Sequence, residues 1–117
     1  MTMHYRVIND YTSKYADAIA FEEGEAITRE QADDENPGWW WCTDKRGKSG
    51  WVHESFFYED DYRYIASQDY SAVELQVKAG DTLAGLREVG GWLLAHTVAG
   101  ARGWVPLEHV QQMSDEP

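Results

Sequence analysis

The chain contains one structural unit twice, and this repeat limits the folds it can adopt more than any other feature of its sequence. Residues 37–57, PGWWWCTDKRGKSGWVHESFF, align without a gap on residues 90–110, GGWLLAHTVAGARGWVPLEHV. The identical pairs of this alignment include Trp39 with Trp92, Gly50 with Gly103, Trp51 with Trp104 and Val52 with Val105. Identities at fixed spacing in rare residue types indicate a duplicated fold rather than a shared composition.

The likeness extends upstream of this block. AFEEGEAI (20–27) aligns with LQVKAGDTL (75–83), each with a glycine followed by an acid, and NDY (9–11) aligns with QDY (68–70). We therefore expect two domains, one over residues 3–58 and one over residues 63–112, the first with the longer loops.

Neither copy has the periodicity of a helix. Runs of four to seven residues such as HYRVI, WWWCT, RYIA and WLLAHTV alternate with glycine and polar turns, the pattern of a small barrel of short strands. The two copies are joined by EDDY (59–62), which reaches at most about 14 Å when extended. The sequence thus predicts an all-β protein of two small barrels in tandem, with a very short linker and the domains packed together.

Charge and cysteine content narrow the possible partners and compartment. With 21 acidic and 10 basic residues the formal net charge is −11, which argues against a nucleic acid or an anionic membrane as partner. This negative charge favours a basic protein as partner, or it serves the solubility of the chain alone. The single cysteine, Cys42, excludes an intramolecular disulfide. The first ten residues, MTMHYRVIND, do not show a basic segment followed by an apolar run, and no apolar run reaches membrane-spanning length. We expect a cytoplasmic monomer.

The first copy resembles SH3 domains, whose motifs run ALYDY, then LSF-x-x-G-D/E, then a tryptophan pair, then G-W/Y-x-P-x-N-Y-V. VINDY (7–11) occupies the ALYDY place, IAFEEGE (19–25) the second, GWWW (38–41) the third and GWVHESFF (50–57) the last. The second copy resembles the same family through ASQDY (66–70), ELQVKAGD (74–81) and GWVPLEHV (103–110), with shortened RT and n-Src loops. The resemblance covers about residues 4–112 and implies two five-stranded SH3-like barrels, a bacterial variant SH3 being one form of them.

SH3 domains bind proline-rich segments in the polyproline II conformation on ridges of aromatic side chains. By resemblance, the groove of the first copy consists of Tyr11, Trp39, His53 and Phe56. Its acidic loops would meet a lysine or arginine beside the prolines through Asp17, Asp33, Asp34 and Glu35. The corresponding groove of the second copy consists of Tyr70, Trp92, Pro106 and His109.

Both grooves depart from the family pattern. Asn9 and Gln68 replace the first tyrosine of ALYDY, so one wall of the outermost proline pocket is polar in each copy. His53 replaces the family proline in the first copy, and His109 replaces the tyrosine in the second. Ordinary proline-peptide recognition, contact of a folded partner through other surfaces, and coverage of one groove by the other domain all remain open.

No arrangement of residues indicates catalysis. Cys42 aligns with Ala95 in mid-strand, which favours a buried structural thiol, and the four histidines lack the spacing of metal ligands. We expect no enzyme activity, no metal and no cofactor. The leading hypothesis is an adaptor or regulatory module that binds a basic or proline-containing segment. The alternative is a structural or inhibitory small subunit that binds a folded protein.

Overall fold

The computed structural model describes residues 2–13 and 18–113 and is all-β, which confirms the predicted fold class. It contains two antiparallel sheets of five strands and one two-stranded sheet. Two turns of 3-10 helix accompany them, η1 (Glu54–Phe56) and η2 (Leu107–His109). Within the described residues no helix is long and apolar enough to cross a membrane.

The compact units of the structure differ from the expected ranges 3–58 and 63–112. Unit 1 combines Met1–Ala16 with Val73–Pro117, and unit 2 is the intervening segment Asp17–Ala72. Unit 2 is thus inserted in the sequence of unit 1.

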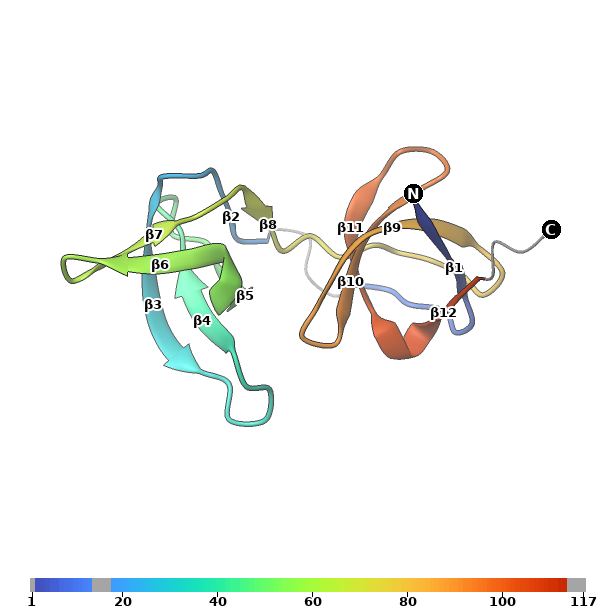
Figure 1. Ribbon diagram of the computed structural model, residues 1–117, viewed down its shortest axis with the longest axis horizontal. Coiled ribbons are helices and arrows are strands. Elements are labelled where there is room, and N and C mark those ends of the chain that lie inside the picture. The colour runs from blue at the N-terminus through green and yellow to red at the C-terminus, as the bar shows by residue number, and fades with distance from the viewer. Residues whose placement is uncertain (1, 14–17, 114–117) are drawn as a thin grey trace. The chain divides into compact units, whose positions relative to one another are not determined.

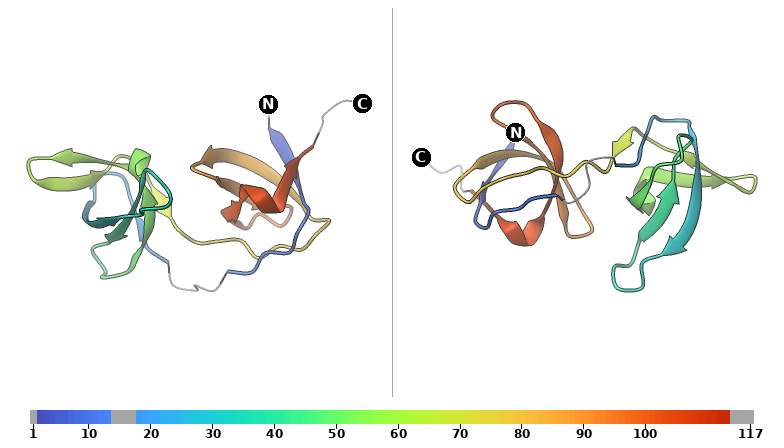
Figure 2. Two further views of the ribbon diagram at one scale, coloured as in Figure 1. Left: turned by 90° about the horizontal axis from the view of Figure 1, so that it is seen from below. Right: turned by 180° about the vertical axis from the view of Figure 1, so that it is seen from behind.

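Unit 1 holds a five-stranded sheet in the order β11-β10-β9-β1-β12. Its strands are β1 (Met3–Val7), β9 (Thr82–Val89), β10 (Trp92–Thr97), β11 (Arg102–Pro106) and β12 (Val110–Gln112). The blue N-terminal strand lies among the orange and red strands from the other end of the chain (Figures 1 and 2). It pairs with β9 on one side and with β12 on the other.

Unit 2 repeats this order as β5-β4-β3-β7-β6. Its strands are β3 (Ala26–Ala32), β4 (Trp39–Thr43), β5 (Ser49–His53), β6 (Phe57–Asp60) and β7 (Arg63–Ala66). A second, two-stranded sheet joins β2 (Ala20–Phe21) to β8 (Tyr70–Ser71).

The first strands of the two repeats are interchanged. β1 comes from the first repeat but completes the sheet of the second, and β7 comes from the second but completes the sheet of the first. The registers correspond residue by residue, because Arg6 pairs with Thr82 in unit 1 as Ile65 pairs with Ala26 in unit 2. Each barrel therefore has the strand order expected of one repeat but is built from both.

The segment that joins the repeats explains this interchange. Residues 59–62 are not a linker but the end of β6 and a two-residue turn, so that Asp60 pairs with Arg63 in a tight hairpin (Figure 1). Asp61 and Tyr62 have φ of 48° and 69°, as a type I′ hairpin turn requires. Closing so short a loop costs less chain entropy than bringing β1 to β6 across some fifty residues, and this gain offsets part of the cost of pairing β1 with β9 and β12 across longer stretches of chain.

Contacts between distant residues also favour the interchanged pairing. The Tyr5 hydroxyl donates to Glu88 Oε2 at 2.5 Å, which together with burial raises the pKa of Tyr5 to about 12. Its ring packs so closely on Gly85 that a Cβ there would collide with Tyr5 Cε1. In the first repeat the residues that align with Gly85 and Glu88 are Arg29 and Ala32. If β1 paired within the first repeat, the Tyr5 hydroxyl would therefore have no carboxylate partner at the position of Glu88.

Each barrel has its own apolar core, and the repeated glycines lie at matching points of both. Gly50 in unit 2 faces Ile19, whose Cγ2 would be 2.8 Å from an added Cβ, and Gly103 in unit 1 faces the carbonyl oxygen of Val73 at the same distance. Only glycine admits such close approach of a crossing chain. The Val52 and Val105 side chains that follow in the repeat are fully buried.

Candidate functional site

Unit 1 brings together an aromatic cluster at its surface. The Tyr11 and Trp92 rings meet edge to face with centroids 6.2 Å apart, and the His109 ring contacts Tyr11 at 5.2 Å. Pro106 lies opposite Trp92 in the pairing of β11 with β10. All four side chains are half-buried, so each is fixed by neighbours and still meets solvent. We call Tyr11, Trp92, Pro106 and His109 the unit 1 cluster.

Polar contacts anchor the segment that carries Tyr11. Its hydroxyl donates to the carboxylate of Glu74, and its backbone N–H donates to Val77 O at 2.8 Å. The Asp10 carboxylate accepts from the N–H of Ala79 at 2.7 Å, and His109 Nδ1 lies 3.2 Å from Asp10 O. The ring positions are therefore held by bonds between residues from both ends of the chain. The importance of Glu74 was not predicted, although this residue begins the motif ELQVKAGD.

Unit 2 assembles the corresponding side chains in a more buried form. The His53 ring packs on Trp39 at 5.2 Å, and the Phe56 ring packs on Tyr70 at 4.6 Å. The exposed fractions of Trp39, Phe56 and Tyr70 are 7%, 3% and 7%, so these three belong to the core. The Tyr70 hydroxyl donates to Trp51 O at 2.8 Å. The aromatic faces of this predicted groove are thus less accessible than those of the unit 1 cluster.

The two tyrosines are exchanged relative to the predicted grooves. We expected Tyr11 beside Trp39 and Tyr70 beside Trp92. In the structure Tyr11 lies with Trp92, and Tyr70 lies in the unit that contains Trp39. The reason is the interchange of first strands, because each tyrosine follows the strand that crosses into the other repeat's barrel.

The predicted acidic residues form a loop between β3 and β4. Asp33 accepts hydrogen bonds from the Asn36 side chain at 2.9 Å and from the Glu35 N–H at 3.0 Å, and these bonds lower its pKa. Its carboxylate therefore shapes the loop, while the Asp34 and Glu35 side chains are exposed. Asp17 lies outside the described residues.

The three consecutive tryptophans have separate roles in unit 2. Trp39 is buried, Trp40 is half-buried against the guanidinium of Arg29, and Trp41 is 36% exposed. Trp41 meets Trp51 edge to face across β4 and β5, with centroids 5.1 Å apart, and Trp51 is 42% exposed. In unit 1 the counterpart of Trp51, Trp104, is buried.

The single cysteine and the potential metal ligands of the described residues give no indication of a reactive centre. Cys42 is fully buried, and desolvation raises the pKa of its thiol to about 12. A thiol that stays protonated is a poor nucleophile and a poor metal ligand. Within residues 2–13 and 18–113, no group of three or more histidine, cysteine, aspartate or glutamate side chains is placed to hold a metal ion.

Comparison with known proteins finds one family, over the first repeat. None of the curated proteins matches the chain. The sequence model of the family described as the variant SH3 domain matches residues 4–59, whose first strand lies in unit 1 and whose other strands lie in unit 2. SH3-type domains are in general non-catalytic protein-interaction modules. The first repeat, residues 4–59, is therefore similar in sequence to the variant SH3 domain.

Proposed function

We propose that the chain is a protein-interaction module whose unit 1 cluster binds a proline-containing segment with a basic residue beside it. The observation that carries this proposal is the pair of half-exposed rings, Tyr11 and Trp92, set nearly perpendicular at 79°. Perpendicular flat faces form a notch of the kind into which the proline rings of a polyproline II helix pack.

Charge around the cluster suits a basic flank on the ligand. The Glu74 carboxylate lies at the Tyr11 hydroxyl, and the Glu108 side chain, which is 85% exposed, lies next to His109 in η2. A lysine or arginine of the ligand would reach these carboxylates as it passes the cluster. The net charge of −11 would speed the encounter with a basic segment at low salt.

The test is an NMR titration of the whole chain with a basic proline-rich peptide. We expect shifts at Tyr11, at the Trp92 indole N–H and at His109. Trp92→Ala should weaken binding at least about tenfold, as expected for a central aromatic anchor. Trp51→Ala is the matched control, because it removes an exposed tryptophan from unit 2, and it should change the affinity less than about twofold. Unchanged affinity in Trp92→Ala would refute the proposal.

A second function is favoured by the exposed pair Trp41 and Trp51. Two tryptophans that are 36% and 42% exposed form an apolar patch of the kind that anchors protein interfaces. This patch supports the alternative of a structural or inhibitory subunit that binds a folded partner. The same two variants separate the functions: a native partner, recovered at fixed stoichiometry, would be lost with Trp51→Ala and kept with Trp92→Ala.

A further inference from the structure

A hollow of about 410 Å³ lies in unit 2, apart from the residues of either predicted groove. It is lined by the first half of β3, by the turn that follows β4 and by the tip of the β6–β7 hairpin. Three of its lining residues are cationic, namely Arg29, Lys45 and Arg63. The chain has 10 basic and 21 acidic residues, so the chain as a whole is acidic, whereas the lining of this hollow is rich in cations.

The guanidinium of Arg29 is held in a fixed orientation. Its Cζ lies 3.8 Å from the centroid of the Trp40 ring and 4.2 Å from that of the Tyr64 ring. Aromatic rings on the guanidinium faces leave the N–H groups at its edge for hydrogen bonding. Within the described residues the Arg29 guanidinium makes no ion pair or hydrogen bond, so its planar fork is available to an oxyanion.

The hairpin tip adds a second cation and an exposed ring. Arg63 is exposed, and its guanidinium, like that of Arg29, makes no ion pair or hydrogen bond to the part of the chain that the structure describes. Tyr62 is 95% exposed at a backbone φ of 69°, where a glycine would be the unstrained residue. A strained, fully exposed aromatic residue contributes little to folding, and it borders the hollow.

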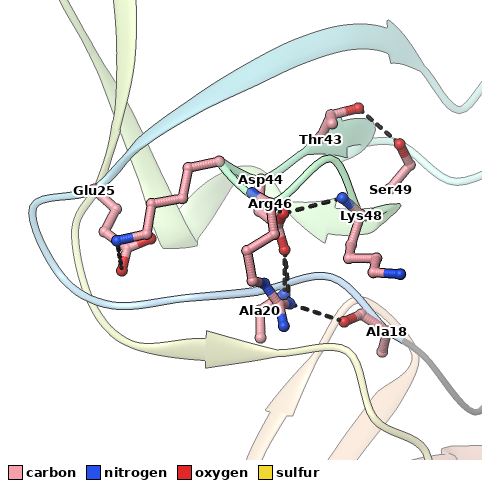
Figure 3. Close-up of polar contacts among 9 residues, drawn as sticks. Ala18, Ala20, Glu25, Thr43, Asp44, Arg46, Lys48 and Ser49 are labelled. Atoms are coloured by element: carbon pink, nitrogen blue, oxygen red, sulfur yellow. Dashed lines mark hydrogen bonds and ion pairs between the residues drawn. The ribbon is translucent and has the colours of Figure 1, made fainter.

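The lining also contains one carboxylate, that of Asp44. It does not neutralise these cations, because its oxygens already accept hydrogen bonds from other groups. Asp44 accepts from Arg46 Nη2 at 2.9 Å and from the backbone N–H groups of Ala20, Arg46 and Lys48 (Figure 3). Burial opposes its ionisation, but these hydrogen bonds outweigh burial and lower the pKa of Asp44 to about 2. Lys45 pairs with Glu25 at 3.3 Å, which leaves two unpaired guanidinium groups.

We propose that this hollow binds a small phosphate ester that carries a flat aromatic ring. Two unpaired guanidinium groups match the double charge of a phosphate monoester better than the single charge of a carboxylate. The hollow is larger than one phosphate group, and the exposed ring of Tyr62 at its rim is placed to stack on a ring of the ligand. The proposal is independent of the unit 1 cluster.

The test uses phenyl phosphate as probe, with inorganic phosphate and phenol as its two halves, in NMR titrations of the whole chain. We expect phenyl phosphate to shift the Trp40 indole N–H and the amides of residues 62–64, and to bind more tightly than either half. Equal affinity for phenyl phosphate and inorganic phosphate would overturn the role of Tyr62. The absence of shifts with both phosphates would overturn the site.

Variants separate binding from folding. Arg63→Gln should weaken phenyl phosphate binding about tenfold, whereas Arg102→Gln, which removes an exposed arginine of β11 in unit 1, should leave it unchanged. Tyr62→Gly relieves the positive φ, so it should unfold at a higher denaturant concentration and yet bind phenyl phosphate no better than inorganic phosphate. Equal loss of binding in Arg63→Gln and Arg102→Gln would show attraction by general charge alone and refute the proposal.

Discussion

An engineered disulfide between β1 and β9 tests the interchange of first strands directly. Val7 N–H donates to Asp81 O at 2.8 Å, so the adjacent pair, Arg6 and Thr82, is a non-hydrogen-bonded pair of the antiparallel ladder. The Cα atoms of such a pair lie about 4.5 Å apart, within the range that a disulfide spans. Both residues are exposed, so Arg6→Cys with Thr82→Cys should oxidise readily without disturbing the core.

The size of the effect follows from the loop that the bond closes. A loop of roughly 80 residues lowers the entropy of the unfolded chain by an amount worth about 4.5 kcal/mol at 25 °C, which is a ceiling because engineered bonds often deliver less. We expect the oxidised variant to gain about 2 to 4 kcal/mol in the free energy of unfolding of unit 1. Urea unfolding followed through the amide signals of β9 and β12 measures this gain, and reduction of the same sample should abolish it.

The matched control is Arg6→Cys with Ala26→Cys. Ala26 aligns with Thr82 and pairs with Ile65, so Arg6 would lie beside it only if each repeat kept its own first strand. Both pairs are made in a Cys42→Ala background, since Ala95 fills the same position in the other repeat. Efficient closure of the 6–26 bond with none at 6–82 would refute the interchange. A covalent dimer of the 6–82 variant would instead place β1 in a second copy.

Three further predictions follow from buried groups. Gly103→Ala should cost about 1 to 3 kcal/mol of stability, measured by urea unfolding, because its Cβ would lie 2.8 Å from Val73 O, a backbone atom that cannot rotate away. The Asp44 carboxylate has a folded pKa of about 2, below its unfolded value, so about 1 to 2 kcal/mol of stability is present above pH 4 and is lost as the pH falls toward 2. Replacing Asp44 with Asn should flatten that part of the stability profile. The Cys42 thiol, with a pKa of about 12, should resist an aromatic disulfide reagent at pH 8 until the protein is unfolded.

Much of the candidate site could be predicted from residue types at fixed spacing. Trp92, Pro106 and His109 were assigned to one groove, and they do lie together with a tyrosine of the DY motif. Which tyrosine this is could not be predicted. Both first strands carry a tyrosine at the same place, Tyr5 and Tyr64, so local pattern cannot assign either strand to a barrel.

The solvent exposure of the groove side chains could not be predicted from the sequence either. Trp39 aligns with Trp92 and was expected to form a ligand ridge in the same way, yet the first is buried and the second is half-exposed. The hairpin turn at Asp61 and Tyr62 was also hard to predict from the sequence, because two-residue hairpin turns usually contain glycine or asparagine. Side-chain burial depends on which residues from elsewhere in the chain cover a ring, and spacing carries no information on that.

The sequence by itself determined the repeat, the all-β class and the residue types of each groove, because strand alternation, turn glycines and tryptophan spacing are local properties of the chain. The tertiary structure decided which first strand closes which barrel, and hence that Tyr11 joins Trp92. That choice depends on contacts such as Tyr5 with Glu88 and Tyr11 with Glu74, which join residues more than sixty positions apart, and on the low entropic cost of the tight β6–β7 hairpin.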